Sequence, residues 1–492
     1  MKISFPVRIY LIALILRLVP VLLTRSLGIG LDDMFQYDML ARSISSGHGF
    51  RWYAQDDLKM LAPYVKFDMT TAKGYDPEYG LYTSFRAPLY PAFLALVYFF
   101  NGLDFSRFFA ARLAQIIFLG APLAPLTYWV TKRLSLFPLS FEMDQERGKK
   151  KEEVVGRIAA WIVACYPMLL VYPLGLGTEN LFFVLLLSSF FFLLKSIDNP
   201  ATIHFLLAGL FLALTTLTRS VILPFAVISI LYLIYLHRKK ALLTGLAFII
   251  VLLPWVVRNS LLHHKLTGVE TSMGYNLYLG YHPEGNGSFV FGPSLDLLSI
   301  MDDAERDKVG TQTAIQFIKD APERFIPLAV NRLGFFFGLE KRVLVYFYSN
   351  NILGFIPKPV LLIISAFLLL PFVFISISSA LGASLLKCDS RIALEGLLFF
   401  TYLLPHVFIL AEDRFHLALI PYMAILAAYF WVNGFQSLAV CWRESNYGKL
   451  AVLVATLVVF LLLTNWGFEL ARDADKISAL LGPNGNKTYF PY

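Results

Sequence analysis

Long apolar runs separated by short charged segments dominate the pattern of hydrophobic and polar positions along this chain. Runs of this kind form helices that cross a bilayer, which takes about 20 mainly apolar residues per helix. They fall at residues 9–23, 108–130, 158–171, 181–194, 204–217, 221–236, 242–257, 359–381, 392–410, 417–432 and 450–466. The pattern predicts an all-α polytopic membrane protein with about 11 transmembrane helices.

A further apolar run, residues 88–103, is short and flanked by prolines. If it does not cross, the basic loops at residues 132–157, 237–240, 387–391 and 443–449 all lie on the cytoplasmic side with the amino terminus. If it crosses, those loops lie outside, against the positive-inside rule. We therefore predict that this run is a non-crossing or re-entrant part of the first outer loop.

This topology predicts one transmembrane domain, residues 1–466, with two sizeable extracytoplasmic loops and an outer tail. The loops are residues 24–107, which include juxtamembrane helices, and residues 260–351; the tail is residues 467–492. Lys2 and Arg8 precede the first apolar run as in a signal peptide, but no small-residue cleavage site is apparent. We expect an uncleaved first span in a multi-pass plasma (inner) membrane protein.

The composition agrees with a membrane location. The chain is 57% hydrophobic and only 15% charged, whereas soluble domains are about 25% charged. Its net charge of +8 is explained by basic cytoplasmic loops, so we expect the lipid bilayer and no nucleic acid as a partner. The three cysteines have no metal-type spacing, and we expect no structural disulfide.

Adjacent carboxylates mark the first candidate site. Asp32 and Asp33 follow the first apolar run and begin a segment whose apolar and aromatic positions, Tyr37 among them, have helical spacing. This predicts paired acids at the start of an amphipathic helix on the membrane surface. Aspartate at a helix start also caps free backbone N–H groups, so a purely structural role stays open for either residue.

The predicted topology gathers the other unusual polar residues on the same outer face. They are Arg86, Glu179, Arg219, Arg258 with Asn259, and the run Glu412-Asp413-Arg414-Phe415-His416. Each arginine alone can mark a span boundary, where its side chain reaches the headgroups. Charges at membrane level are expensive, however, so the group as a whole indicates a functional site.

These residue types favour group transfer at the membrane surface. A carboxylate can take a proton from an attacking hydroxyl, and arginines can hold a lipid-borne phosphate as it departs. No nucleotide-binding glycine loop and no nucleophile elbow is present. Ion-coupled transport uses similar charges within membranes, so it remains an alternative on these residues alone.

The order of short motifs resembles the GT-C glycosyltransferases, in particular the branch of protein O-mannosyltransferases and lipid A aminoarabinose transferases. The matching stretches are Asp32-Asp33 with Tyr37 and Ala41, Gly47 to Phe50, Phe85 to Pro91, Tyr166-Pro167, Thr178 to Phe182, Gly209 to Arg219, Pro254-Trp255 with Arg258-Asn259, and Arg414 to His416 with Pro421. The resemblance covers residues 1 to about 435 and implies a GT-C fold.

The resemblance implies roles for individual residues. Asp33, with Asp32 as the alternate, matches the carboxylate that acts as base on the acceptor hydroxyl, and Glu179 matches a second acid that positions the acceptor or a metal. Arg219 takes the place of a cation that meets the donor's phosphate. Arg258 and Arg414 are further candidates for the phosphate or the sugar. Arg86-Ala87 replaces an acidic–basic pair of some relatives, which argues against a metal site there.

The sequence thus predicts a membrane glycosyltransferase that uses a polyprenyl-phosphate sugar as donor, with inversion at the transferred carbon. The acceptor is a hydroxyl of a glycan, lipid or protein on the extracytoplasmic face. No cofactor is required, no metal ligands are assigned, and a divalent metal is compatible with the prediction. The alternatives are a lipid-linked glycan polymerase or ligase and, less favoured, a transporter or flippase.

Overall fold

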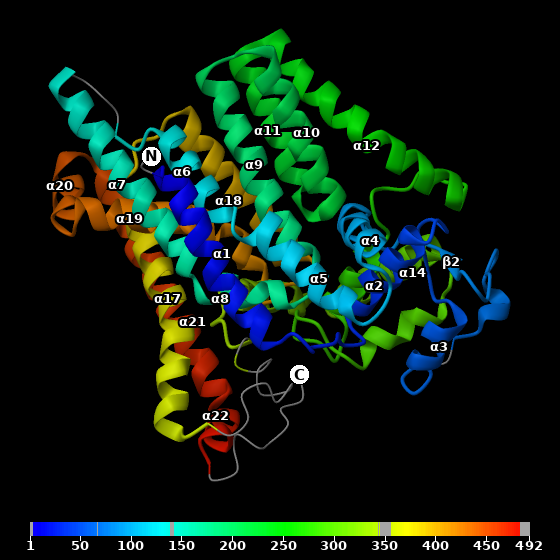
Figure 1. The fold of residues 1–492 in the computed structure, drawn as a ribbon. Helices are drawn as coiled ribbons and strands as arrows, with labels where there is room; N and C mark the ends of the chain where they lie inside the picture. The colour runs from blue at the N-terminus through cyan, green and yellow to red at the C-terminus, as the bar shows by residue number, and fades with distance from the viewer. Residues whose placement is uncertain (1–2, 66, 138–141, 343, 345–355, 483–492) are drawn as a thin grey trace.

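The computed structural model describes residues 3–65, 67–137, 142–342, 344 and 356–482. Within these residues the fold is almost entirely helical (Figure 1). One small sheet occurs, in which β1 (Arg51–Trp52) pairs antiparallel with β2 (Leu81–Tyr82). The apolar helices and this minimal strand content confirm an all-α polytopic membrane protein.

The long helices and their direct continuations form the bundle. They are α1 (Phe5–Leu23), α5 (Ser106–Ala114) with η2 (Gln115–Gly120) and α6 (Leu123–Leu134), α7 (Glu142–Cys165) with α8 (Pro167–Val171) and η3 (Tyr172–Leu174), α9 (Thr178–Asp198), α10 (Thr202–Thr218), η4 (Ser220–Ile222) with α11 (Leu223–His237), η5 (Arg238–Ala241) with α12 (Leu242–His263), α17 (Lys358–Ala383), α18 (Ser390–Phe408), η8 (Phe415–Leu419) with α19 (Ile420–Asn433), and α21 (Asn446–Arg472).

Shorter elements occupy the connections between them. They are α2 (Asp33–Ser45), α3 (Gln55–Leu61), η1 (Met69–Thr71), α4 (Leu89–Asn101), α13 (Met273–Tyr281), η6 (Pro293–Ser299), α14 (Asp303–Asp320), η7 (Pro322–Arg324), α15 (Phe325–Phe336), α20 (Gln436–Glu444) and α22 (Ala474–Leu481). Figure 1 shows α2, α3, α4, α14 and β2 gathered at one side of the bundle, on the right of the view.

In the described part of the chain, eight helices are long and apolar enough to cross a membrane, or nine if the bent pair α7 and α8–η3 counts as one span. The predicted number was about 11. Two reasons account for much of the difference. Residues 220–263 count as one candidate span although they contain both α11 and α12, and α10, with 17 residues, is too short to be counted. The number of crossings stays a prediction.

The break between α11 and α12 lies at Arg238. A straight helix over the 44 residues 220–263 would be about 66 Å long, more than twice the apolar thickness of a bilayer. Arg238 instead has φ +52°, outside the right-handed helical region, and η5 follows it. The chain therefore ends one apolar helix and starts another at the basic segment Arg238–Ala241.

Helix α19 lies at the centre of the bundle and packs against α7 and α17. Every side chain from Ile420 to Phe430 is buried, which is why this stretch is apolar on all sides. Its residues join those of α6, α7, α9 and α18 in the largest hydrophobic cluster of the protein. The outer helices of the bundle expose many large apolar side chains, as membrane-facing helices do.

Ion pairs fix the end of the bundle that carries the carboxyl end of α9. Asp198 lies 2.8 Å from Arg391 Nε at the start of α18 and 3.5 Å from Arg133 Nη1 at the end of α6. Helix α9 has 21 residues and is about 30 Å long, so its first turn lies at the opposite end. The basic loops that were assigned to the cytoplasm include both arginines.

The 13-residue helix α4 begins and ends beside α2. Arg86, just before α4, donates to Gln36 Oε1 at 2.8 Å, while Tyr98 near its end donates to Asp38 Oδ1 at 2.9 Å. Arg107, beyond its end, also donates to Asp38 Oδ1, at 2.8 Å. Both flanks of α4 therefore contact the first half of α2, and that residues 88–103 do not cross the membrane stays a prediction.

Candidate active site

The amino end of α2 separates the roles of the two adjacent aspartates. Asp32 is the residue before the helix, and its Oδ1 accepts the backbone N–H of Met34 at 2.9 Å, which is an N-cap. Asp33 is the first helical residue, and its carboxylate accepts a hydrogen bond from Arg86 Nη2. Only Asp33 therefore makes ion pairs with the arginines described below.

Hydrogen bonds between the first outer loop, the second outer loop and α12 fix the chain just before Arg86. The carboxylate of Asp303, at the start of α14, accepts hydrogen bonds from the Thr83 hydroxyl and, at 2.9 Å, from the Ser84 backbone N–H. Arg258 donates to the carbonyl oxygen of Thr83 at 2.6 Å. The second outer loop and the end of α12 thus fix the chain two and three residues before Arg86.

Glu179 lies in the first turn of α9 and faces Arg219, the residue that ends α10. Arg219 Nη1 lies 2.7 Å from Glu179 Oε1. Next to Glu179, the Asn180 amide donates to Gln115 Oε1 at 3.1 Å, and Gln115 in turn donates to the carbonyl oxygen of Pro173 at 2.9 Å. Gln115 belongs to the π-helical η2, a distortion that often marks functional regions.

Arg414 connects these pairs. Its Nη2 donates to Asp33 Oδ2 at 3.5 Å, and its Nε lies 3.7 Å from Glu179 Oε1 and 2.9 Å from Glu412 Oε2. Arg342 Nη2 donates to the same Glu412 oxygen at 3.0 Å. Residues from α2, α9 and the connection between α18 and η8 therefore meet at the Arg414 guanidinium, and Arg342 at the end of the second outer loop joins them through Glu412.

We call these residues the charged cluster: Asp33, Arg86, Glu179, Arg219, Arg342, Glu412, Asp413 and Arg414. The cluster opens to solvent at Asp33, whose side chain is 38% exposed, while the side chain of Glu179 is only 7% exposed. The side chains of Arg86, Arg219 and Arg414 are 18–24% exposed. Solvent therefore reaches one carboxylate and three guanidinium groups of the cluster.

The arginines control the protonation of the acids outside the spans. Burial alone raises the pKa of Asp33, but the charges of Arg86, Arg414 and Arg219 outweigh burial and bring this pKa below its ordinary value of 3.8. Arg414 and Arg342 likewise outweigh burial at Glu412 and lower its pKa. Burial and the neighbouring charge of Asp33 raise the pKa of Asp32. Asp33 is therefore ionised at neutral pH.

The structure places the remaining sequence-predicted residues outside the charged cluster. Arg258 donates to Thr83 and Asn259, and Asn259 donates to the carbonyl oxygens of Gly268 and Val269 at 2.9 and 3.0 Å. Both residues hold loop backbone. Arg258 connects α12 to the first outer loop and Asn259 connects it to the second, and a substrate contact by either residue stays a prediction.

Tyr37 and His416 lie beneath the charged cluster. Tyr37 is 4% exposed, with the Arg86 guanidinium 5.4 Å from its ring centre. His416 is fully buried: Phe372 stacks on its ring at 4.2 Å, and its Nε2 lies 2.9 Å from Glu340 Oε1. Both side chains are therefore buried and pack against cluster residues or their neighbours, and their contact with a substrate stays a prediction.

Sequence reasoning missed Arg342, and it placed Glu412 and Asp413 on the outer face without giving either residue a role of its own. Arg342 Nε lies 3.2 Å from Asp413 Oδ1, and Arg342 Nη2 also binds Glu412. One signal was available, because Glu340, Lys341 and Arg342 form a run of three charges immediately after an apolar stretch. Such a run marks a segment leaving apolar surroundings, but it does not reveal a partner that is distant in the sequence.

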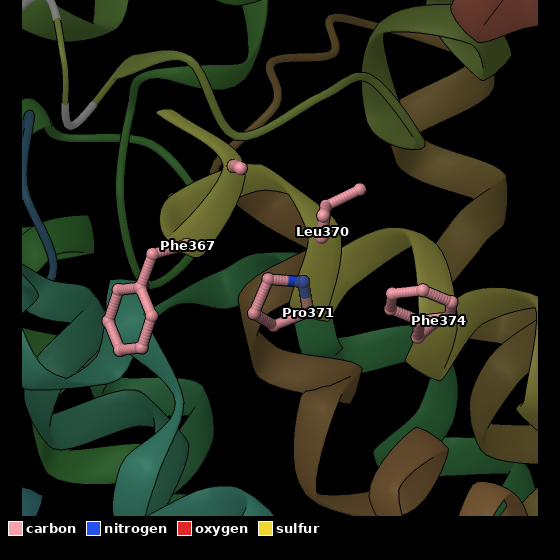
Figure 2. A pocket seen from close by; sticks show the side chains of 5 residues that line it. Phe367, Leu370, Pro371 and Phe374 are labelled. Atoms are coloured by element: carbon pink, nitrogen blue, oxygen red, sulfur yellow. The ribbon is translucent and has the colours of Figure 1, made fainter. Parts of the chain in front are cut away.

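A separate apolar hollow lies on α17, away from these charges. It is lined by Ala366, Phe367, Leu370, Pro371 and Phe374, which Figure 2 shows along one helix. Its lining has no charged side chain, so it offers nothing to bind a phosphate. Among the described residues, no three His, Cys, Asp or Glu side chains come together as metal ligands, and metal dependence stays an untested expectation.

The fold and the charged cluster define an all-α polytopic membrane protein with an ionic site at one end of its bundle. No family model and no curated protein matches the chain. Among solved structures, the chain is similar to the archaeal oligosaccharyltransferase AglB from Archaeoglobus fulgidus, in complex with an inhibitory peptide and a dolichol-phosphate. The TM-score is 0.47 at 13% identity, over 99% of this chain and 60% of that chain. This chain thus spans about 60% of that protein's length.

Proposed function

We propose that the protein is a membrane glycosyltransferase that moves a sugar from a polyprenyl-phosphate donor to a hydroxyl acceptor on the extracytoplasmic face. The observation that carries this proposal is the charged cluster, which combines a partly exposed carboxylate with guanidinium groups at the end of a helix bundle. Its residues supply a base, Asp33, and cations for a departing phosphate, Arg219 and Arg414.

In the proposed reaction, the acceptor oxygen forms a bond to the anomeric carbon of the donor sugar. The bond from that carbon to the phosphate oxygen breaks, and its electron pair leaves with the polyprenyl phosphate. Asp33 takes the proton of the acceptor hydroxyl, and Arg219 and Arg414 stabilise the charge that develops on the phosphate. A single displacement of this kind inverts the configuration at the anomeric carbon, by analogy with inverting sugar enzymes.

The structure gives little support to a polymerase or ligase that uses the arginines of the large outer loop, because all of them except Arg342 of the charged cluster bind backbone oxygens. Arg324 donates to the carbonyl oxygens of His282 and Gly285, at 3.2 and 2.9 Å. Arg332 donates to those of Gly280 and Val407, and Arg306 donates to that of Ile300. These guanidinium groups hold loop backbone, whereas the arginines of the charged cluster face carboxylates and solvent.

One observation favours the transporter alternative. Glu395 in α18 is 3% exposed, and neither of its carboxyl oxygens has a hydrogen-bond partner among the described residues. Buried acids in spans often serve proton-coupled transport. Another buried charge in a span, Arg17 in α1, donates to the carbonyl oxygens of Ala13, Val163 and Ala164, at 3.1–3.2 Å, and has a structural role.

The deciding experiment measures sugar transfer from radiolabelled polyprenyl-phosphate sugars in reconstituted membranes. We expect Asp33→Asn to lower the rate by about 10²-fold to 10⁴-fold through loss of the base, with donor still bound. Asp32→Asn is the matched control and should retain most activity, because asparagine caps a helix as well as aspartate does. Full activity of Asp33→Asn would contradict the mechanism, and no transfer by the unaltered chain would favour transport.

A further inference from the structure

The segment Leu339–Arg342 connects the charged cluster to α21, the last long helix of the bundle. Two of its residues bind α21: the Leu339 N–H donates to Glu469 Oε2 at 2.9 Å, and Lys341 Nζ lies 2.6 Å from Glu469 Oε1. Lys341 also pairs with Asp473 at the carboxyl end of α21. One side of the segment is therefore anchored on a helix that carries no cluster residue.

The other two residues of the segment, Glu340 and Arg342, contact residues that precede and follow Arg414 in the sequence. Arg342 lies against Glu412 and Asp413, which precede Arg414, and Glu340 lies 2.9 Å from His416 Nε2, which follows it. Alternate residues of one short segment thus contact α21 and the residues that flank Arg414.

The contact between Glu340 and His416 is buried and directional. His416 Nδ1 lies 2.7 Å from the carbonyl oxygen of Phe336, and since a carbonyl can only accept, Nδ1 carries a hydrogen. Glu340 Oε1 also accepts the hydroxyl hydrogen of Tyr166. With both residues at most 1% exposed, the bonds fix the rotamer of His416 and the backbone two residues from Arg414.

The contact between Arg342 and Glu412 acts directly on the Arg414 guanidinium. Glu412 Oε2 lies 3.0 Å from Arg342 Nη2 and 2.9 Å from Arg414 Nε, so one carboxylate oxygen joins two arginines. Loss of the Arg342 charge leaves this buried carboxylate with an incomplete set of partners. Arg414 would then lose the fixed orientation that brings it within 3.5 Å of Asp33 and 3.7 Å of Glu179.

We propose that Leu339–Arg342 is a positioning segment, in which Arg342 and Glu340 set the place and orientation of Arg414 for the phosphate of the donor. The catalytic relevance of this proposal rests on the proposed glycosyl transfer, but the positioning of Arg414 does not. Arg342 and Glu340 act through other residues and are positioning residues. The C-terminal helix α21, through Glu469 and Asp473, becomes part of the scaffold of the site.

The first test reads Arg414 without any substrate. The full-length protein is treated with phenylglyoxal, and modification of Arg414 is followed by mass spectrometry for the unaltered chain, Arg342→Gln, Arg342→Lys, Glu340→Ala and the control Arg324→Gln. We expect Arg414 to react several-fold faster in Arg342→Gln and Glu340→Ala, with an intermediate rate in Arg342→Lys. The control should match the unaltered chain. Unchanged Arg414 reactivity in Arg342→Gln and Glu340→Ala, at an unchanged melting temperature, would overturn the proposal.

The second test measures sugar transfer by the same proteins. We expect kcat to fall by about 10-fold to 100-fold in Arg342→Gln, because a small displacement of a substrate-orienting group is costly, with a smaller rise in the donor KM. Equal kcat values for Arg342→Gln and Arg324→Gln would contradict the role in catalysis. Absence of transfer by the unaltered chain would contradict the proposed function alone, since Arg414 reactivity still decides whether the segment positions that residue.

Discussion

Arg414 faces three carboxylates from three parts of the chain, so the geometry of the site depends on one guanidinium group. Asp33 forms ion pairs with both Arg86 and Arg414, and it is the most exposed acid of the charged cluster. Its ionisation is therefore under the control of two arginines that the substrate can also reach.

The pH dependence of transfer should report this control. The folded pKa of Asp33 lies below its ordinary value of 3.8, so this proposed base stays ionised until the pH falls below 3.8. Among the neighbouring charges, Arg86 lowers the pKa of Asp33 the most. Removal of Arg86 therefore gives more weight to burial, which raises this pKa. We expect the acid limb of kcat/KM to move to higher pH in Arg86→Gln.

The control for this prediction is Arg25→Gln, which removes an arginine just after the carboxyl end of α1 and outside the charged cluster. Its acid limb should coincide with that of the unaltered chain. An acid limb at the same pH in Arg86→Gln would show that Arg86 does not set the ionisation of the base.

At the residue level, the sequence located most of the charged cluster but not its pairing. Hydropathy placed Asp33, Glu179, Arg219 and Arg414 at the outer ends of apolar runs, and the structure brings these residues together. Local patterns could not distinguish Asp33 from Asp32, because the capping residue and the cluster residue are both aspartates at the start of the same helix. Nor could they reveal Arg342, whose partners Glu412 and Asp413 lie about 70 residues later.

At the level of helices, apolar length predicted where the chain is helical better than how each helix ends or packs. The end of α11 depends on the positive φ of Arg238, and the bend between α7 and α8–η3 measures 54°. Such breaks are set by backbone geometry and neighbouring helices, which leave little trace in hydropathy. Close helix contacts are similarly hidden, because they depend on single small residues.

Gly209 in α10 makes one such contact. A Cβ atom at this position would collide with the carbonyl oxygen of Thr244 in α12, which is backbone and cannot turn away. We expect Gly209→Ala to destabilise the protein by about 1–3 kcal/mol through overpacking, measured as a lower melting temperature in detergent.

Gly245, on the partner helix α12, provides the matched control. A Cβ atom there would meet only Ile230 Cγ2, at an ordinary distance of 3.5 Å. Gly245→Ala should leave the melting temperature unchanged or raise it, because alanine favours helix more than glycine does. Similar melting temperatures for the two variants would show that α10 and α12 do not pack as closely as described.

At the level of the whole molecule, the charged cluster and the ion pairs of Asp198 occupy opposite ends of α9. The positive-inside rule assigns the Asp198 end, with its basic loops, to the cytoplasm. Cys388 is exposed and lies three residues before Arg391, which pairs with Asp198, so it marks this end.

Labelling with a membrane-impermeant maleimide tests the assignment of the two ends. In a variant that keeps Cys388 but carries Cys165→Ser and Cys441→Ser, we expect labelling in inverted vesicles and none in intact cells. Adding Glu323→Cys, an exposed position of the second outer loop, should introduce labelling from outside. Labelling of Cys388 in intact cells would reverse the predicted orientation of the bundle.

The balance of charge within the cluster also governs how a ligand arrives. Its ion pairs join four carboxylates to four guanidinium groups: Asp33, Glu179, Glu412 and Asp413 against Arg86, Arg219, Arg342 and Arg414. Opposite charges at this spacing cancel within about 8 Å, the Debye length at physiological salt. If the proposed lipid-borne donor binds here, we expect it to arrive by lateral diffusion without long-range steering, so ionic strength should have little effect on its capture rate.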